Sequence, residues 1–258
     1  MAINGTCISS CEDEHGTIYV YQTRTTRTLS FDDEVEQSCM HLNQPDGLAH
    51  RYTQAMMSGL FFLTEPQTAT IMGLGAGSMA KCLLSSFTDI RVHAIEYREQ
   101  VVNTARRFFN LPYDERLQLH IDDAVSFMQN NKIQSDIIFS DLYNRRGMEP
   151  RQIQLSYLRN CKKSLTDQGV LVLNLWHKDF NSTAEIEDLL SHEFENRLLS
   201  FEVEGGNTIV LAFKNDIPAI KQKELLAQGK QLEIQMNIPV ARYAKLLWRT
   251  QQYKFATV

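Results

Sequence analysis

The chain has few cysteines, and their placement gives no sign of cross-linking. The five are Cys7, Cys11, Cys39, Cys82 and Cys161, and no C-x-x-C pair occurs among them. An odd number at irregular spacings argues against a disulfide framework and against a zinc site. Because reduced thiols are typical of the cytosol, we expect a cytoplasmic protein that holds no metal.

Long apolar runs and an excess of positive charge are also missing. No apolar stretch approaches the roughly 20 residues that a membrane-spanning helix needs. The N-terminus lacks the basic and apolar regions of a signal peptide. The net charge is -5 and the isoelectric point is near 5.8, which argues against a nucleic-acid-binding surface. We therefore expect neither membrane nor nucleic-acid partners.

The sequence does contain a nucleotide-binding pattern at 68–109. An apolar run at 69–72 leads into G-x-G-x-G at 73–77, a helical pattern starts at Ser78, and a second apolar run ends at Glu96. This order of strand, glycine turn, helix, strand and acid is typical of a βαβ nucleotide-binding unit. Glycine permits the tight turn and the close approach of a ligand to the main chain.

The spacing of the glycines indicates which nucleotide is bound. The motif consists of Gly73, Gly75 and Gly77, whereas the dinucleotide fingerprint requires a further glycine at the position of Ser78. The pattern therefore favours an S-adenosyl compound over NAD. The alternative is a tight turn that binds nothing, and the rest of the chain makes it less favoured.

The first 44 residues predict a small β module. Alternating β-branched and aromatic residues at 17–22 and 27–31, and a further run at 35–40, indicate three strands. Such a sheet is too small to be stable alone, so it should pack on the main domain or on a second subunit. A helix is expected at 48–63.

The remaining pattern predicts an α/β fold. Strands are expected at 117–121, 135–140 and 169–176, helices at 99–109, 124–129, 151–165 and 182–194, and a hairpin at 197–204 and 207–214 around Gly205-Gly206. This arrangement matches the seven-stranded Rossmann-like sheet of class I methyltransferases. We divide the chain into the β module (1–44), a nucleoside-binding catalytic domain (45–215) and a helical C-terminal extension (216–258).

Four acids follow the predicted strands: Glu96, Asp122, Asp123 and Asp141. Open α/β sheets bind ligands at the carboxyl ends of their strands, so these acids should converge on one crevice beside the glycine turn. Glu96 is expected to accept the ribose hydroxyls and Asp123 the adenine amino group. Asp141 is expected to face the sulfonium, with Asp122 in the same crevice.

About 160 residues, from Gly16 to Trp176, resemble spermidine synthases. The matching pieces occur in the family's order and spacing. They are R-x-L-x-F-D-D-x-x-E-Q at 27–37, Y-T-Q-A-M-M at 52–57, G-L-G-A-G-S at 73–78, A-I-E-Y at 94–97, R-R-F-F at 106–109, D-D-A-V-S-F at 122–127 and D-I-I-F-S-D at 136–141.

The resemblance implies a transferase, usually dimeric, that moves an aminopropyl group from decarboxylated S-adenosylmethionine to putrescine. It implies that Gln37, Glu96 and Asp123 contact the cosubstrate. Tyr52 and Gln54 fall where the family has a tyrosine and a glutamate near the substrate.

Three of the family's acids are replaced in this chain. Ala76 takes the place of an acid within the glycine loop, Gln54 that of the glutamate, and Asn144 that of the second aspartate in D-x-x-D, which accepts the amine proton. An amide cannot act as a base, so Asp141 or Tyr143 would have to replace it. Without an acid at 76, full S-adenosylmethionine becomes tolerable as a ligand.

Three functions therefore remain open, in order of preference. The first is an aminopropyltransferase that acts on an amine, with Asp141, Tyr143 and Asn144 as the catalytic group. The second is an S-adenosylmethionine-dependent methyltransferase with an unknown acceptor. The third is a non-catalytic binder of nucleosides or polyamines. A homodimer is expected in each case.

Overall fold

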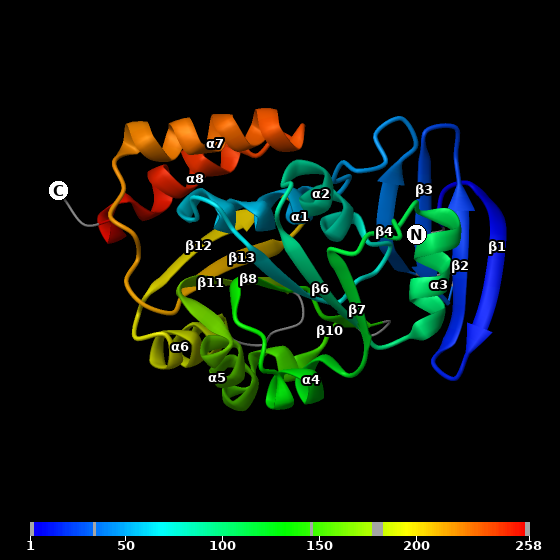
Figure 1. The fold of residues 1–258 in the computed structure, drawn as a ribbon, viewed down its shortest axis with the longest axis horizontal. Coiled ribbons are helices and arrows are strands. Elements are labelled where there is room, and N and C mark those ends of the chain that lie inside the picture. The colour runs from blue at the N-terminus through cyan, green and yellow to red at the C-terminus, as the bar shows by residue number, and fades with distance from the viewer. Residues whose placement is uncertain (1–2, 33–34, 145–146, 177–182, 256–258) are drawn as a thin grey trace.

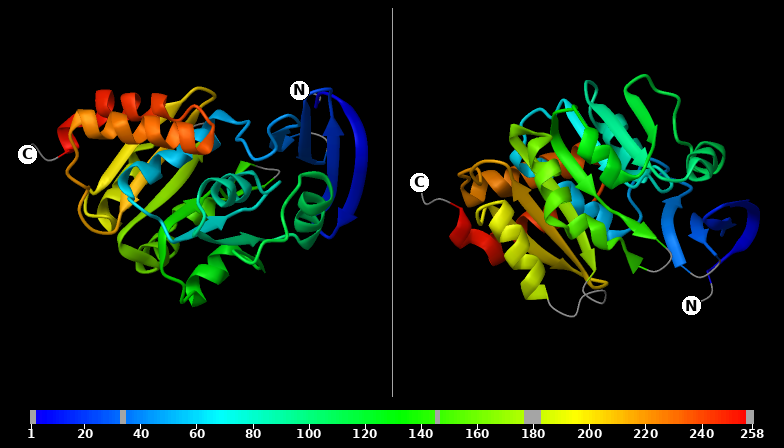
Figure 2. Two further views of the ribbon diagram at one scale, coloured as in Figure 1. Left: turned by 45° about the horizontal axis from the view of Figure 1, so that its top comes forward. Right: turned by 90° about the horizontal axis from the view of Figure 1, so that it is seen from below.

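Two β-sheets of different construction organise the chain (Figure 1). The structure, a computed structural model, describes residues 3–32, 35–144, 147–176 and 183–255. One sheet is a four-stranded antiparallel sheet formed by the N-terminal residues, and the other has seven strands. In Figure 2 the N-terminal sheet stands at one end of the molecule and the C-terminal helices lie at the other.

The N-terminal sheet contains one strand more than the sequence predicts. Its strands follow one another in the order β1 (Thr6–Asp13), β2 (Gly16–Gln22), β3 (Thr26–Phe31) and β4 (Val35–His41). The expected strands at 17–22, 27–31 and 35–40 are confirmed. Strand β1 was not predicted, because its T-C-I-S-S-C-E-D sequence is largely polar and mostly exposed. It exists as an edge strand through its antiparallel pairing with β2.

The seven-stranded sheet confirms the predicted fold class. The strand order is β12-β13-β11-β8-β5-β6-β7. The parallel strands are β5 (Thr68–Met72), β6 (Arg91–Glu96), β7 (Leu117–Ile121), β8 (Ser135–Ser140) and β11 (Leu165–Trp176). An antiparallel hairpin, β12 (Leu198–Val203) and β13 (Asn207–Phe213), completes the sheet through β11. Both turn glycines of this hairpin have positive φ, which glycine adopts readily.

Helices cover both faces of the large sheet (Figure 1). One face carries α1 (Arg51–Met56), the 3₁₀ helix η1 (Met57–Phe62), α2 (Ser78–Ser86), α7 (Gln222–Met236) and α8 (Ala241–Gln251), which ends in η4 (Gln252–Lys254). The other face carries α4 (Ala124–Asn130), α5 (Leu155–Lys163) and α6 (Thr183–Glu193). No helix within the described ranges has the length and apolar character of a membrane span.

Two predicted helices are shorter than expected. The helix at 48–63 begins at Arg51 and is split into α1 and η1, and Gly59 of η1 packs closely on the sheet, where an added Cβ would come within 2.6 Å of Val172. The helix at 151–165 starts only at Leu155, since the 3₁₀ turn η2 (Pro150–Ile153) precedes it. The predicted loop at 142–150 contains a small hairpin of β9 (Tyr143–Asn144) and β10 (Gly147–Met148).

The N-terminal sheet packs on the main domain through a shared apolar cluster. Ile18, Val20, Leu29 and Met40 from the sheet are buried against Ala76, Val101 and Phe109. Val101 belongs to α3 (Glu99–Phe108), which lies against β1 and β2, and Phe109 follows this helix. The glycine loop is therefore held between the two sheets, through the fully buried Ala76.

Candidate active site

A pocket of about 140 Å³ opens at the carboxyl ends of β5, β6 and β8. Strand β4 of the N-terminal sheet and helix α1 supply its other walls. Eight of the residues that the sequence singles out line this pocket: Gln37, Tyr52, Gly73, Gly75, Glu96, Asp122, Asp141 and Tyr143. Gly77, Asp123 and Gln54 are not among its lining residues.

Each glycine of the loop has a backbone conformation in which a side chain would be strained. Gly73, Gly75 and Gly77 have φ of 91°, 54° and 74°, which L side chains rarely adopt. A Cβ at Gly73 would lie 2.5 Å from the Asp141 carbonyl oxygen, and one at Gly75 the same distance from the Ser38 hydroxyl. The loop thus has β8 on one side and β4 on the other. Gly77 serves instead as the residue that precedes α2.

Ala76 does not line the pocket. Its methyl group is fully buried in the apolar cluster with Val101 and Phe109, and its backbone N–H donates to the Ser38 hydroxyl at 3.1 Å. An aspartate at this position would be enclosed by apolar groups, which carries a large desolvation cost. The alanine is therefore explained by packing, and an effect on cosubstrate selectivity does not follow from its position.

Glu96 is tied to the glycine loop by its own carboxylate. Its Oε2 accepts the backbone N–H groups of Leu74 at 3.2 Å and Gly75 at 3.3 Å, and its Oε1 accepts the N–H of Arg98 at 3.0 Å. Desolvation raises the pKa of Glu96, and these three N–H groups offset part of the rise. Because a carboxylate has about four lone-pair sites, about one remains for a ligand hydroxyl unless a loop contact is released.

The two neighbouring aspartates are placed apart. Asp122 is exposed and lines the pocket. Asp123 caps the start of α4, accepting the backbone N–H of Ser126 at 3.0 Å, and pairs with the Arg151 guanidinium at 2.8 Å. Burial opposes ionisation of Asp123, but the Ser126 and Arg151 contacts prevail and lower its pKa. An adenine amino group that donates to Asp123 would have to share this carboxylate with Arg151.

Asp141 is the most strongly perturbed acid in the pocket. Desolvation raises its pKa to about 6, and hydrogen bonds from the Asn174 amide and the Tyr52 hydroxyl oppose this rise. The Asn174 Nδ2 donates to Asp141 Oδ1 at 2.8 Å, and the Asn174 Oδ1 in turn accepts from Asn207 at 2.9 Å. Asp141 is thus largely ionised at neutral pH, yet close to the pKa range of a general base.

Tyr52 and Gln54 belong to different environments. Tyr52 lines the pocket and its pKa is raised by desolvation and by the charge of Asp141. Gln54 is 8% exposed, donates to the Leu48 carbonyl at 2.6 Å and accepts from Arg242 of α8 at 2.5 Å. Residues two apart on a helix do not share a face, and Gln54 does not line the pocket, so its expected place beside the substrate remains a prediction.

The β9 strand carries the remaining catalytic candidates. Tyr143 lines the pocket, and its hydroxyl donates to the Asn174 carbonyl at 3.4 Å. The backbone of Asn144 is paired with Gly147 in the small hairpin, and its side chain lies outside the described part of the chain. Its expected role at the amine therefore remains a prediction.

Three contributors were missed in the sequence. Ser38, next to Gln37, holds the glycine loop, and Asn174 holds Asp141. Arg98, two residues after Glu96, bonds to it through the main chain. Asn174 left a signal, because it is the one amide in the apolar run G-V-L-V-L-N-L-W. Ser38 and Arg98 left none, because the loop that Ser38 holds and the side-chain partner of Arg98, Asp13, are distant in sequence.

A wider hollow of about 760 Å³ adjoins the pocket. The two share Phe31, Glu96, Tyr97, Ala124, Leu142 and Tyr143. The outer walls of the hollow are the turn between β1 and β2 on one side and the Asp123–Arg151 pair on the other. Glu96 therefore stands where a ligand could extend from one space into the other.

Comparison with known proteins identifies a family. Residues 49–193 match the spermine/spermidine synthase domain. A polyamine aminopropyltransferase from Neisseria meningitidis is 32% identical over 192 residues, which cover 73% of each chain.

Two solved structures show the same fold. A spermidine synthase in complex with the transition-state analogue AdoDATO has a TM-score of 0.71 at 14% identity and covers 96% of this chain and 86% of its own. Human methyltransferase-like protein 13 in complex with SAH has a TM-score of 0.67 at 22% identity and covers 73% of this chain and 93% of its own.

The seven-stranded sheet and its likeness to these structures define a class I methyltransferase fold, and the relatives named polyamine aminopropyltransferases make the protein a transferase. Within that class, the chain belongs to the spermine/spermidine synthase family.

Proposed function

We propose that the protein transfers an aminopropyl group from an S-adenosyl cosubstrate to a small amine. The observation that carries this proposal is the convergence of Glu96 and Asp141 with the glycine loop, Tyr52 and Tyr143 on one pocket. The Neisseria relative, whose name specifies polyamine aminopropyl transfer, supports the reaction type. Decarboxylated S-adenosylmethionine is the preferred cosubstrate and putrescine the preferred acceptor.

In this proposal the neutral amine attacks the carbon next to the sulfonium. A C–N bond forms, the C–S bond breaks, and methylthioadenosine leaves as a neutral thioether. An ammonium group has no free electron pair, so one proton must leave the amine. Asp141 is the best placed acceptor, because it is ionised above pH 6 and is oriented by Asn174. Tyr52 and Tyr143 line the same space and complete the amine side.

The cosubstrate side is assigned to the glycine loop, Gln37 and Glu96. Glu96 is the ribose acceptor, since an acid at this strand end serves that role in Rossmann-like sites. Asp122 and Asp123 are assigned to the adenine of the cosubstrate, and Arg151 competes with the adenine for Asp123. In this view residues 1–44 close the site, residues 45–215 carry it, and residues 216–258 pack on it. A homodimer is the proposed assembly.

A methyltransferase is the second candidate. The human methyltransferase structure, whose title names SAH, has the same fold, and no lining residue of the pocket is an acid from within the glycine loop. A carboxylated cosubstrate would then meet Ser38 and the main chain of the glycine loop rather than an acid of that loop. This candidate predicts a preference for S-adenosylmethionine over its decarboxylated form.

A binding and turnover experiment separates these functions. We expect calorimetry to show binding of decarboxylated S-adenosylmethionine and methylthioadenosine, and expect Glu96→Ala to lose about 1.5–3 kcal/mol of affinity, as for a hydrogen bond to a charged group. Turnover is then measured with putrescine. Tighter binding of the carboxylated cosubstrate would favour the methyltransferase, and binding without turnover of any amine would favour a non-catalytic binder. If the wild type binds none of these compounds, the proposal fails.

A further inference from the structure

Arg98 is an unusual residue to find beside the pocket, because it is a buried cation. Its side chain is only 7% exposed. Its backbone N–H donates to Glu96 Oε1 at 3.0 Å. The main chain of Arg98 therefore helps to hold the carboxylate that we assign to the cosubstrate. A buried guanidinium is costly unless it is paired and hydrogen-bonded, and the partners of Arg98 come from the other sheet.

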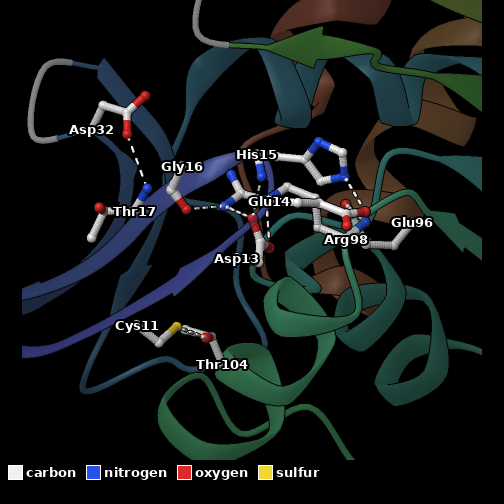
Figure 3. A network of polar contacts seen from close by, with 10 residues as sticks. All are labelled: Cys11, Asp13, Glu14, His15, Gly16, Thr17, Asp32, Glu96, Arg98 and Thr104. Carbon is white, nitrogen blue, oxygen red and sulfur yellow. Dashed lines mark hydrogen bonds and ion pairs between the residues drawn. The ribbon is translucent and has the colours of Figure 1, made fainter.

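The turn between β1 and β2 supplies these partners (Figure 3). The Asp13 carboxylate accepts Arg98 Nε at 3.0 Å and an Nη at 2.7 Å, which is the bidentate geometry of a strong pair. The same Nη donates to the Gly16 carbonyl at 2.8 Å. The guanidinium carbon lies 4.5 Å from the centre of the Phe31 ring, as in a cation–π contact. Arg98 is therefore fixed on three sides.

The turn itself is built to present Asp13 in this way. Asp13 Oδ1 also accepts the backbone N–H of His15 at 2.8 Å, and the Thr17 N–H donates to Asp32 at 3.0 Å. Gly16 has φ of 108°, and a Cβ there would lie 2.7 Å from the Asp32 carboxylate. Desolvation acts against the charge of Asp13, but the contacts with Arg98 and His15 outweigh it and lower its pKa.

The clamped turn also forms a wall beside Glu96. Asp13, His15 and Gly16 line the wider hollow together with Tyr97 and Glu96. The His15 ring lies 4.6 Å from the ring of Tyr97, which is 57% exposed at the rim of the pocket. The N-terminal sheet therefore borders the site twice. Its β1–β2 turn lines the wider hollow beside Glu96, and its strand β4 lines the pocket beside the glycine loop.

We infer that the Asp13–Arg98 pair is a positioning clamp that fixes the Glu96 carboxylate for the ribose hydroxyls of the cosubstrate. The inference rests on the proposed function, because it assigns Glu96 to the ribose. Neither Asp13 nor Arg98 reacts. They act through the Arg98 main chain, which carries the N–H that holds Glu96 Oε1.

The test compares methylthioadenosine with its 2′-deoxy analogue by calorimetry. We expect the full-length wild type to bind the ribose form about tenfold more tightly, as for one lost hydrogen bond to a charged group. In Asp13→Asn and in Arg98→Lys, which keeps the charge but loses the bidentate fork, this ratio should fall toward one. The double variant should show the same ratio as each single variant, because one interaction is removed in all three.

Arg27→Gln provides the matched control. Arg27 also joins the N-terminal sheet to α3, through the Phe108 carbonyl, but it does not line the pocket or the hollow. Its loss should lower the melting temperature while leaving the ribose-to-deoxyribose ratio unchanged. The KM for the amine is a second readout. It should stay within about twofold of the wild-type value in all clamp variants, because the clamp does not touch the amine side of the pocket.

The outcomes are distinct. A wild type that binds neither compound sinks the proposed function itself. A wild type that prefers the ribose, together with clamp variants that keep the same preference, overturns the clamp alone. Equal weakening of both compounds in the clamp variants and in Arg27→Gln would also overturn it, because that pattern reports only loosened docking of the sheet.

Discussion

At the scale of single residues, burial decides what each acid can do. Glu96 ends β6 and Asp141 directly follows β8 of the same sheet, yet their carboxylates differ in partners. Glu96 receives three backbone N–H groups, whereas Asp141 has the Asn174 amide and the Tyr52 hydroxyl. The first arrangement suits a rigid acceptor. The second, with a pKa near 6, suits a proton acceptor.

The proposed role of Asp141 as the base gives a pH prediction. A base must be deprotonated to act, so kcat/KM should fall as the pH drops through about 6. In Asn174→Ala the hydrogen bond that stabilises the carboxylate is lost, the pKa of Asp141 rises further, and the acidic limb should move to higher pH. Profiles of both proteins with the same amine check this. An unmoved limb in Asn174→Ala, or normal turnover in Asp141→Asn, would remove Asp141 as the base.

At the scale of elements, the N-terminal sheet is joined to the site at two places. Strand β4 places Gln37 in the pocket and Ser38 on the glycine loop. The turn between β1 and β2 holds Arg98. The sheet also covers Ala76, Val101 and Phe109. Because the sheet contributes both lining residues and core packing, we expect its removal to abolish the site.

Deletion of residues 1–44 should therefore abolish binding of methylthioadenosine. It would also uncover the apolar cluster and leave the Ala76 N–H without its acceptor, so partial aggregation is expected. Calorimetry measures the binding, and circular dichroism shows whether the remaining domain is folded. Gln37→Ala in the full-length chain is the companion variant, because it removes one lining side chain and leaves the packing intact. A folded truncation that binds with wild-type affinity would make the sheet purely structural.

At the scale of the whole molecule, one buried lysine links segments from both parts of the chain. Lys81 of α2 is 2% exposed, and its Nζ donates to the carbonyls of Pro45 at 2.7 Å and Phe109 at 2.6 Å. It also contacts the Met40 sulfur of β4 at 3.3 Å. Desolvation lowers its pKa to about 8, and Asp46 partly opposes this shift.

This lysine predicts a rise in stability at alkaline pH. Its folded pKa is about 8 and its unfolded value is 10.5, so the unfolded state binds more protons in this window. The free energy of unfolding should then increase between pH 8 and 10.5, by about 3 kcal/mol in full. Urea titrations of the wild type and Lys81→Met across this range isolate the effect. Equal pH slopes in the two proteins would show that Lys81 titrates normally.

The sequence by itself determined the fold class, the glycine turn and the acids at the strand ends. These features are local, because a strand period, a positive φ and a residue next to a turn can be read from neighbouring positions. Strands β7 and β8 were predicted to the residue. Asn174 left a trace as the one amide of an apolar run, but its partner Asp141 is 33 residues away and could not be read from the sequence.

Only the tertiary structure decided how those residues are used. It turned Gln54 toward Arg242 and placed Ala76 in a core shared by two sheets. It paired Asp13 with Arg98, 85 residues apart. The physical reason is the same in each case. Burial and hydrogen-bond partners depend on which distant segments come into contact. The local sequence pattern is compatible with many such contacts, and only the packing of the two sheets selects among them.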